Sequence, residues 1–262
     1  MQAETKKNVV VCGYPKSGTT FSTRLVAQLL SSPSLGFWGY EGDTFVTEGK
    51  ERQSDLVCYQ SHHPYEDLAK VSKLSVDKLI YVVRDPRDVV VSGAFHFSFF
   101  RPGTRKILNL VRPMSLQHLL KKMSAKSNSK SYNVDRMIRM LEEGDPYIDH
   151  AHWAWDFHLE SYLNAPDALI VRYEDLIQNG LVTARKILEY GGVNKTNEQI
   201  GLDLEAQSFK KRKSEFENAN DKLKTRHLRK GVAGDWKNHL TKSHIERIND
   251  RFGPLMQQLG YL

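Results

Sequence analysis

The sequence predicts an α/β fold in which helices flank a central parallel sheet, and three observations lead to this prediction. Short apolar runs rich in β-branched residues alternate with longer segments of helical periodicity, a glycine-containing loop joins the first run to the first helical segment, and no internal repeat or long Pro/Gly linker interrupts the 262 residues. Strands that alternate with helices pair in parallel, because the helix carries the chain back to the same edge of the sheet. The predicted fold class is therefore a P-loop-like single domain over residues 1–262.

Each expected element follows from a local pattern. Four apolar runs are expected to be buried strands, namely "NVVVC" (8–12), "LVCYQ" (56–60), "KLIYVV" (78–83) and "ALIVR" (168–172). Five segments have apolar residues at helical spacing, namely 19–32, 86–97, 145–163, 181–190 and 243–260. Pro86 suits the first turn of its helix, whereas Pro254 is expected to kink or break the last helix. Segments 100–135 and 205–232 combine many polar and basic residues with weak periodicity, and we expect them to be mobile loops.

Composition and cysteine content favour a cytoplasmic protein. Hydrophobic residues make up 40% of the chain and charged residues 26%, which is typical of soluble globular proteins. The apolar run before Gly13 has only five residues, too few for a signal peptide or a membrane span. Cys12 and Cys58 alone do not make a disulfide framework, so a reducing compartment is expected.

The net charge of +7 comes almost entirely from one segment. Residues 210–230 contain nine Lys or Arg against three Asp or Glu, and the rest of the chain is close to neutral. Such a run is either a solvated basic face or a cover over a small, multiply charged anion.

The stretch "GYPKSGTTF" (13–21) resembles a phosphate-binding loop whose lysine is displaced. Gly13, Gly18 and Thr20 fit the pattern G-x-x-x-x-G-K-[ST], but Thr19 occupies the lysine position and Lys16 lies inside the loop. A glycine loop that follows a strand and opens a helix directs backbone amides toward an anion at the positive end of the helix dipole. The sequence therefore predicts an anion site here.

Two further motifs suit a second phosphate. In "YVVRDPRDVVVSG", Arg84 ends a strand and Ser92 lies two helical turns further on, where a guanidinium and a hydroxyl can bind one phosphate. The alternative is that Arg84 pairs with Asp85 or Asp88. The third motif, "RKGVAGDWK" (229–237), combines two cations with a flexible glycine.

Together the three motifs resemble the sulfotransferase family that uses 3′-phosphoadenosine-5′-phosphosulfate (PAPS). "YPKSGTT" is similar to the 5′-phosphosulfate loop of that family, "RDPRDVVVS" to its 3′-phosphate motif and "RKGVAGDWKNHLT" to its C-terminal cofactor motif. Their order and spacing agree across almost the whole chain, and the likeness is greatest to the soluble, cytosolic type. The resemblance implies PAPS as co-substrate, no metal, and a small-molecule acceptor rather than a nucleic acid or a membrane.

The resemblance also implies three groups of cofactor contacts. The 5′-phosphosulfate would be held by the loop residues Lys16, Ser17, Gly18, Thr19 and Thr20. The 3′-phosphate would be held by Arg84, Ser92, Arg229, Lys230 and Gly231. The adenine would lie beside Phe21 (where the family usually has a tryptophan), Tyr173 and Phe209, with Ser208 nearby.

The implied catalytic residues are His62, Lys16 and Ser92. "QSHHPYE" (60–66) is similar to the Lys-Thr-His-x-Pro stretch of the family, which makes His62 the general base for an acceptor hydroxyl or amine. Lys16 would stabilise the charge on the leaving phosphate, and His63 would point elsewhere. The chain departs from the family at Gln60, where a lysine is usual.

The acceptor and the oligomeric state are less constrained. Glu41, Asp43 and Asp149 lie among aromatic residues and favour a cationic acceptor, and flat phenols or steroids form the other class. "KNHLTKSHIE" keeps most of a family dimer motif, but Lys242 replaces an apolar residue, so both a monomer and a homodimer stay open.

Two other functions compete with sulfuryl transfer. A P-loop kinase or NTPase would bind ATP–Mg²⁺ more tightly than adenosine 3′,5′-bisphosphate (PAP), although no carboxylate stands at the ends of strands 56–60 and 78–83 to hold the metal. A basic binding module would bind nucleic acid through segment 210–230, with steep salt dependence.

Overall fold

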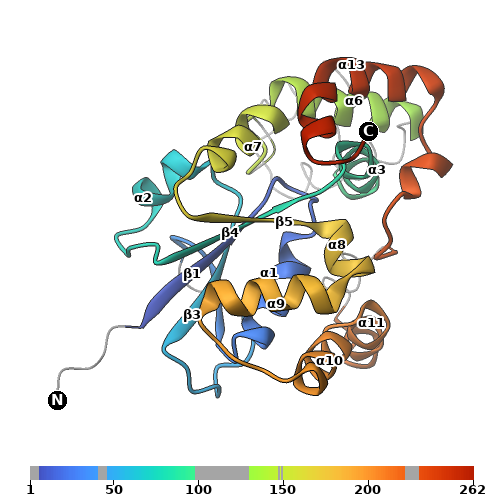
Figure 1. The fold of residues 1–262 in the computed structure, drawn as a ribbon. Helices are drawn as coiled ribbons and strands as arrows, with labels where there is room; N and C mark the ends of the chain where they lie inside the picture. Colours follow the sequence, from blue (N-terminus) through green and yellow to red (C-terminus); the bar gives the residue numbers. More distant parts are fainter. Residues whose placement is uncertain (1–5, 41–45, 98–129, 147, 149, 222–229) are drawn as a thin grey trace, which may run out of the picture.

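A computed structural model describes residues 6–40, 46–97, 130–146, 148, 150–221 and 230–262. Its central sheet has five strands in the order β2-β3-β1-β4-β5, and all four neighbouring pairs are parallel (Figure 1). The strands are β1 (Lys7–Cys12), β2 (Ser34–Phe37), β3 (Leu56–Ser61), β4 (Lys78–Val83) and β5 (Ala168–Arg172). The predicted fold class, a parallel sheet flanked by helices, is confirmed.

Both faces of the sheet are buried, and successive side chains of each strand point to opposite faces. Val9 and Val11 of β1 belong to one apolar cluster, and Val10 and Cys12 belong to the other. The same alternation along β4 divides its side chains between the two clusters. The strands therefore appear in the sequence as continuous apolar runs.

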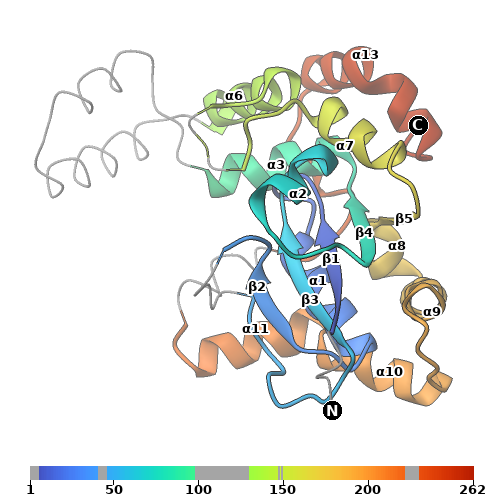
Figure 2. The same ribbon diagram turned by 90° about the vertical axis from the view of Figure 1, so that its left-hand side faces the viewer.

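Helices cover each face. One layer contains α1 (Thr19–Leu29), α9 (Gly180–Gly191) and α10 (Asn197–Ala206), and the other contains α3 (Pro86–His96), α6 (Lys130–Glu143), α7 (Trp155–Leu163) and α13 (Lys242–Gln258). Figure 2 shows the sheet between these two layers. The shorter helices are η1 (Tyr65–Asp67), α2 (Leu68–Val71), α8 (Tyr173–Gln178), α11 (Phe209–Asn218) and η2 (Asp235–Asn238).

The predicted helix over 145–163 is wrong in its first half, because α7 begins only at Trp155. Two left-handed residues, Gly144 (φ 75°) and His150 (φ 65°), turn the chain before it, and the Asp145 amide donates to the Ala151 carbonyl across this turn. Pro254 lies inside α13 without breaking it. The strand β2 was not predicted, since "SLGF" is short and contains a glycine.

The predicted loops have a mixed outcome. Residues 209–218 form the helix α11, so segment 205–232 is not the continuous loop that weak periodicity suggested. In segment 100–135 the helix α6 begins at Lys130, and residues 100–129 lie outside the described part of the chain.

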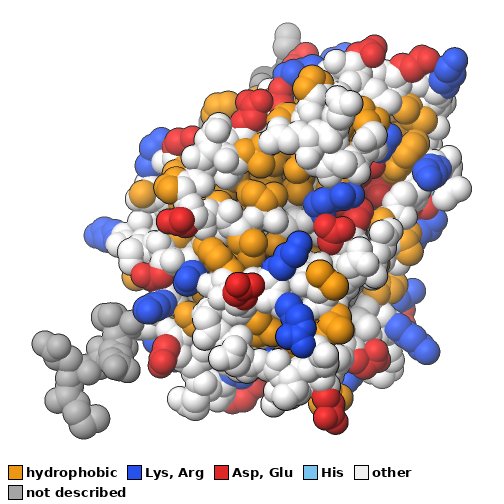
Figure 3. Space-filling view, viewed as in Figure 1, with side chains coloured by type: hydrophobic (Ala, Val, Ile, Leu, Met, Phe, Trp, Pro, Cys, Tyr) orange, Lys and Arg blue, Asp and Glu red, His pale blue; other side chains and the backbone are white. Residues whose placement is uncertain are grey.

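The surface seen in Figure 3 carries Lys and Arg side chains interspersed with Asp and Glu. Within the described residues, no helix has both the length and the apolar character needed to cross a membrane.

Candidate functional site

The predicted site residues come together because they follow parallel strands whose carboxyl ends share one edge of the sheet. Gly13 follows β1, His62 follows β3, Arg84 follows β4 and Tyr173 follows β5. The strands β2 and β3 lie on one side of β1, and β4 and β5 lie on the other, so the strand order reverses beside β1. Ligands of open α/β sheets bind at such a switch point.

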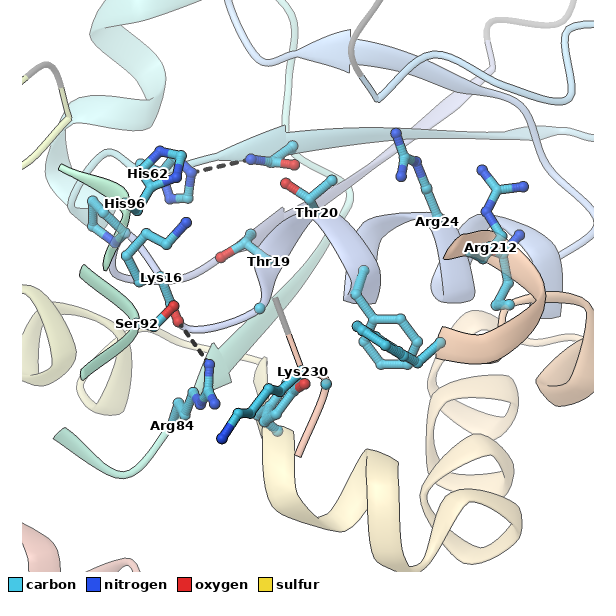
Figure 4. A pocket seen from close by; sticks show the side chains of 18 of the residues that line it. Lys16, Thr19, Thr20, Arg24, His62, Arg84, Ser92, His96, Arg212 and Lys230 are labelled. Carbon is cyan, nitrogen blue, oxygen red and sulfur yellow. Dashed lines mark hydrogen bonds between the residues drawn. The ribbon is translucent and has the colours of Figure 1, made fainter. Parts of the chain in front are cut away.

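A pocket of about 360 Å³ lies at this edge (Figure 4). The predicted residues that line it are Lys16, Gly18, Thr19, Thr20, Phe21, His62, Arg84, Ser92, Tyr173, Phe209, Lys230 and Gly231. Ser17 and Ser208 are not among its lining residues, and Arg229 lies outside the described residues. Lys16, His62 and His96 gather at one end, whereas Arg24 and Arg212 lie at the other.

The β1–α1 loop has the properties of an anion cradle. Lys16 (φ 76°) and Gly18 (φ 86°) are left-handed, and a Cβ at residue 18 would lie 2.4 Å from the Tyr173 ring. The hydroxyls of Ser17 and Thr19 are buried and have no hydrogen-bond partner in the described protein. The first amides of α1 have no acceptor within the helix. The loop therefore fits a phosphate or sulfate group that accepts hydrogen bonds from these donors.

Arg84 joins this loop to residues 230–236, which we call the C-terminal segment. Its guanidinium donates to the Lys16 carbonyl and to the Val232 carbonyl, each at 3.2 Å, and lies 4.4 Å from the centre of the Tyr173 ring. The expected alternative pairing is not observed: Asp85 pairs with Arg87 at 2.7 Å, and Asp88 accepts from the amides of the C-terminal segment. Burial is the largest cause that raises the pKa of Asp88.

The C-terminal segment reaches the pocket because Asp88 of α3 holds it. The amides of Gly234 and Trp236 donate to Asp88 at 2.6 Å and 2.9 Å. Gly231 (φ 65°) lies against Phe209, since a Cβ there would be 2.3 Å from that ring. Lys230 and Gly231 are thus brought beside Ser92 and Arg84 along the same wall.

The aromatic end of the pocket contains Phe21, Tyr173 and Phe209. The rings of Phe21 and Tyr173 meet edge to face with centroids 6.1 Å apart. Phe209 begins α11, and the hydroxyl of Ser208 caps that helix by accepting from the Lys211 amide at 3.4 Å. Ser208 thus acts on the helix rather than on the pocket surface.

His62 is held in one tautomer. Its Nδ1 lies 2.6 Å from the Gly13 carbonyl, which can only accept, so Nδ1 carries the proton. The lone pair of Nε2 then accepts from the side-chain amide of Gln60 at 3.0 Å. Desolvation is the largest cause that lowers the His62 pKa to about 3, and the positive potential of Lys16 adds to it. His62 is therefore neutral at pH 7, with Nε2 as its basic atom.

A buried layer fixes the backbone of the two histidines. His158 is fully buried; its Nε2 donates to the His62 carbonyl at 2.9 Å and its Nδ1 accepts from the Tyr81 hydroxyl at 3.0 Å. The Tyr162 hydroxyl donates to the His63 carbonyl at 2.6 Å. Desolvation lowers the pKa of His158 to about 4 and also lowers that of His63.

Sequence reasoning missed several residues that line the pocket: Arg24, Phe37, His96, Phe97, His150, Gln207 and Arg212. Helical spacing could have found two of them, because Arg24 is one turn beyond Phe21 and His96 is one turn beyond Ser92. The carboxylates proposed for a cationic acceptor, Glu41, Asp43 and Asp149, lie outside the described residues. Among the described lining residues there is no Asp or Glu. The described residues also contain no group of three or more His, Cys, Asp or Glu that could hold a metal ion.

Comparison with known proteins identifies related sequences. Residues 6–260 match the sulfotransferase domain family. A 3-beta-hydroxysteroid sulfotransferase of Cavia porcellus is 29% identical over 93% of this chain and 81% of its own length. A flavonol 3-sulfotransferase of Flaveria bidentis is 26% identical, over 92% of this chain and 79% of its own.

Solved structures share the fold. The crystal structure of mouse sulfotransferase SULT7A1 complexed with PAP has a TM-score of 0.65 and 21% sequence identity, and the likeness covers 97% of this chain and 85% of that one. Retinol dehydratase in complex with androsterone and PAP has a TM-score of 0.56 and 18% identity, with 94% and 80% covered.

Proposed function

The chain belongs to the sulfotransferase domain family, and from this premise we propose that it transfers the sulfuryl group of PAPS to a hydroxyl or amine of a small-molecule acceptor. The observation that carries the proposal is the meeting of an anion-binding loop, a buried arginine and a neutral histidine in one pocket at the carboxyl edge of the sheet.

The pocket residues divide by the part of PAPS that they would bind. The loop donors and Lys16 suit the 5′-phosphosulfate, since the buried hydroxyls of Ser17 and Thr19 need acceptors. Arg84, Ser92 and Lys230 suit the 3′-phosphate, together with Gly231 and, by the sequence resemblance, Arg229. Phe21, Tyr173 and Phe209 offer ring faces to the adenine.

When bound, PAPS supplies the sulfuryl group, and its 5′-phosphate oxygen keeps the electron pair of the broken S–O bond. His62 Nε2 takes the proton of the acceptor hydroxyl as the acceptor oxygen bonds to sulfur. Lys16 stabilises the negative charge that develops on the leaving phosphate. Both residues line the same end of the pocket, where the sulfuryl group would lie between the acceptor and the leaving phosphate.

The acceptor would enter beside Phe37, Phe97, His96 and His150, which line the pocket near His62. These rings suit either flat phenols and steroids or, through cation–π contact, a small cationic natural product. The relatives with steroid and flavonol names favour the first class, and Glu41, Asp43 and Asp149 favour the second. A panel with both classes is therefore required.

The experiment has a binding arm and a transfer arm. We expect PAP to raise the melting temperature more than ATP–Mg²⁺ does, because a ligand bound only by the folded state stabilises it. With labelled PAPS and the acceptor panel, His62→Ala is expected to lower kcat by about 10²-fold or more, and Lys16→Ala by about 10²-fold. The exposed residues Lys70 and His152 provide matched controls as Lys70→Ala and His152→Ala. Preference for ATP–Mg²⁺ would favour a kinase or NTPase, and full activity of both site variants would refute the assigned roles.

Localisation and assembly stay predictions. The free, buried thiols of Cys12 and Cys58, whose pKa values burial raises to about 12, suit a reducing cytoplasm. Lys242 is exposed at the first turn of α13, and sedimentation of the purified chain would distinguish monomer from homodimer.

A further inference from the structure

Gln60 lies at the end of β3 in direct contact with the base. Its side chain is almost fully buried, with 1% of the residue exposed, and it lines the pocket. The amide Nε2 is 3.0 Å from His62 Nε2, whereas the amide Oε1 is buried and has no hydrogen-bond partner in the described protein. A buried carbonyl without a donor is rare and costs free energy, so its presence calls for an explanation.

The direction of the Gln60–His62 hydrogen bond follows from its surroundings. Because the Gly13 carbonyl takes the Nδ1 proton of neutral His62, the facing atom of Gln60 must donate to the lone pair of Nε2. An amide turned by 180° would place its oxygen against that lone pair. The observed orientation of the Gln60 amide is therefore the one that matches a neutral His62 ring.

The backbone of Gln60 is fixed, so only its side chain can respond to a change at His62. In the β3 ladder Gln60 is paired with Val11 of β1 and Phe37 of β2, and its carbonyl accepts from the Trp38 amide at 2.8 Å. Gln60 and His62 are two residues apart at the end of one strand, which places both side chains on the same face.

We propose that Gln60 is a positioning residue that pairs with both protonation states of His62: its amide N–H donates to the neutral ring, and its rotated carbonyl accepts from the Nε2–H of the imidazolium. The inference rests on the proposed function, in which the acceptor hydroxyl displaces the Gln60 N–H from the single lone pair of Nε2 and then gives that atom its proton. Rotation breaks one hydrogen bond and forms another, because Oε1 has no bond to lose. The unpartnered carbonyl thereby acquires a role in the second state.

The neighbours of His62 explain why such an acceptor matters. Lys16 of the loop, His150 and His158 of α7 all oppose a positive charge on the ring, and burial opposes it further. The Gln60 amide lies 3.0 Å from Nε2 through its nitrogen, and a 180° rotation would put its carbonyl in that place to accept the proton. Without it, the imidazolium formed during transfer would face only cationic or neutral donors.

Three substitutions separate the two halves of this role. Gln60→Met has similar length and neither donor nor acceptor, Gln60→Lys can only donate, and Gln60→Glu can only accept when ionised. Gln257→Met on the exposed face of α13 is the matched control. Each full-length protein is checked for folding by circular dichroism, and the nearly isosteric Gln60→Glu keeps the test informative if another variant fails to fold.

Two readouts are measured, namely the His62 tautomer and pKa by ¹⁵N NMR, and the pH profile of kcat. In the unaltered protein we expect the Nδ1–H tautomer. The His62 pKa is expected to fall in Gln60→Met, because the charge-assisted bond to the imidazolium is stronger than the bond to the neutral ring, to rise in Gln60→Glu and to fall most in Gln60→Lys. For Gln60→Met, kcat is expected to fall about tenfold, the effect of roughly one hydrogen bond, with little change in the acceptor KM.

The proposal is overturned by an Nε2–H tautomer in the unaltered protein, or by a Gln60→Met variant whose His62 pKa and kcat match those of the control. The NMR arm needs no turnover. A protein with the expected tautomer and pKa order, but with no sulfuryl transfer to any acceptor, would refute the proposed function while leaving the pairing of Gln60 with His62 established.

Discussion

At the scale of single residues, Arg84 is the side chain on which most of the cofactor end depends. It is buried, it donates to two backbone carbonyls on separate segments, and its plane lies over Tyr173. Its Nε is also buried and has no partner within the described protein, and the two carbonyls take only two of the five N–H donors of the guanidinium, so donors remain for an anion. A planar guanidinium can satisfy all these contacts at once, whereas an ammonium cannot.

Arg84→Lys tests this dependence while keeping the charge. We expect the affinity for PAP to fall by at least about tenfold, because the forked donors and the ring contact are lost together. Titration calorimetry measures the change, and Arg139→Lys on an exposed position of α6 is the control. Equal affinities of the two variants would mean that Arg84 does not bind a phosphate.

At the scale of elements, α11 is attached to α1 through one carboxylate. Glu48 accepts from Arg212 of α11 at 2.8 Å and from Gln207 at 2.9 Å, and it lies 3.5 Å from Arg24 of α1. Both guanidinium groups also lie within about 5 Å of the Phe216 ring centre, at 5.2 Å for Arg24 and 4.8 Å for Arg212. This contact fixes the start of α11, where Phe209 faces the pocket.

Glu48→Gln would remove the carboxylate that lies between two partly buried guanidinium groups. We expect a loss of about 3 kcal/mol of stability, faster hydrogen exchange in α11, and weaker PAP binding through displacement of Phe209. Glu215→Gln is the control, since Glu215 also pairs with Arg212 but is exposed, where an ion pair contributes about 1 kcal/mol or less. Unchanged exchange over 209–218 in Glu48→Gln would show that the carboxylate does not hold the helix.

The elements also show which parts of the molecule could be predicted from sequence. The four long strands were predicted to within one residue, because both faces of each strand are buried and the apolar run is continuous. The position of the site at one edge of the sheet could also be predicted from these strands, since His62 and Arg84 come directly after strands and Lys16 lies in the loop after the first one. Arg24 and Arg212 could not be predicted as neighbours, because their contact depends on how α11 packs on α1.

At the scale of the whole molecule, the backbone of the candidate site is joined to the larger apolar core. His158 connects Tyr81 of β4 to the His62 carbonyl, and its ring meets Tyr14 edge to face at 5.7 Å. Tyr81 and Tyr162 stack with centroids 4.3 Å apart in the same core. The position of His62 therefore depends on the packing of β4, α7 and the segment that follows β1 together.

Two desolvated, neutral histidines make the stability of the whole fold sensitive to acid. The pKa of His62 is lowered to about 3 and that of His158 to about 4, whereas an unfolded histidine titrates near 6.5. Above pH 6.5 both states leave these rings neutral, and the stabilisation is complete. As the pH falls from 6.5 toward about 4, the unfolded chain binds protons that the folded protein excludes, so stability is lost.

Each histidine should contribute a slope of about 1.4 kcal/mol per pH unit within that range. Urea unfolding between pH 7 and pH 5 measures the slope. His158→Gln keeps a donor for the His62 carbonyl but cannot titrate, so we expect its slope to be smaller by one histidine's share. The exposed His152→Gln is expected to keep the full slope. If the slopes of His158→Gln and the unaltered protein were the same, the acid sensitivity would have to come from the carboxylates, and the buried histidines would not limit the folded state.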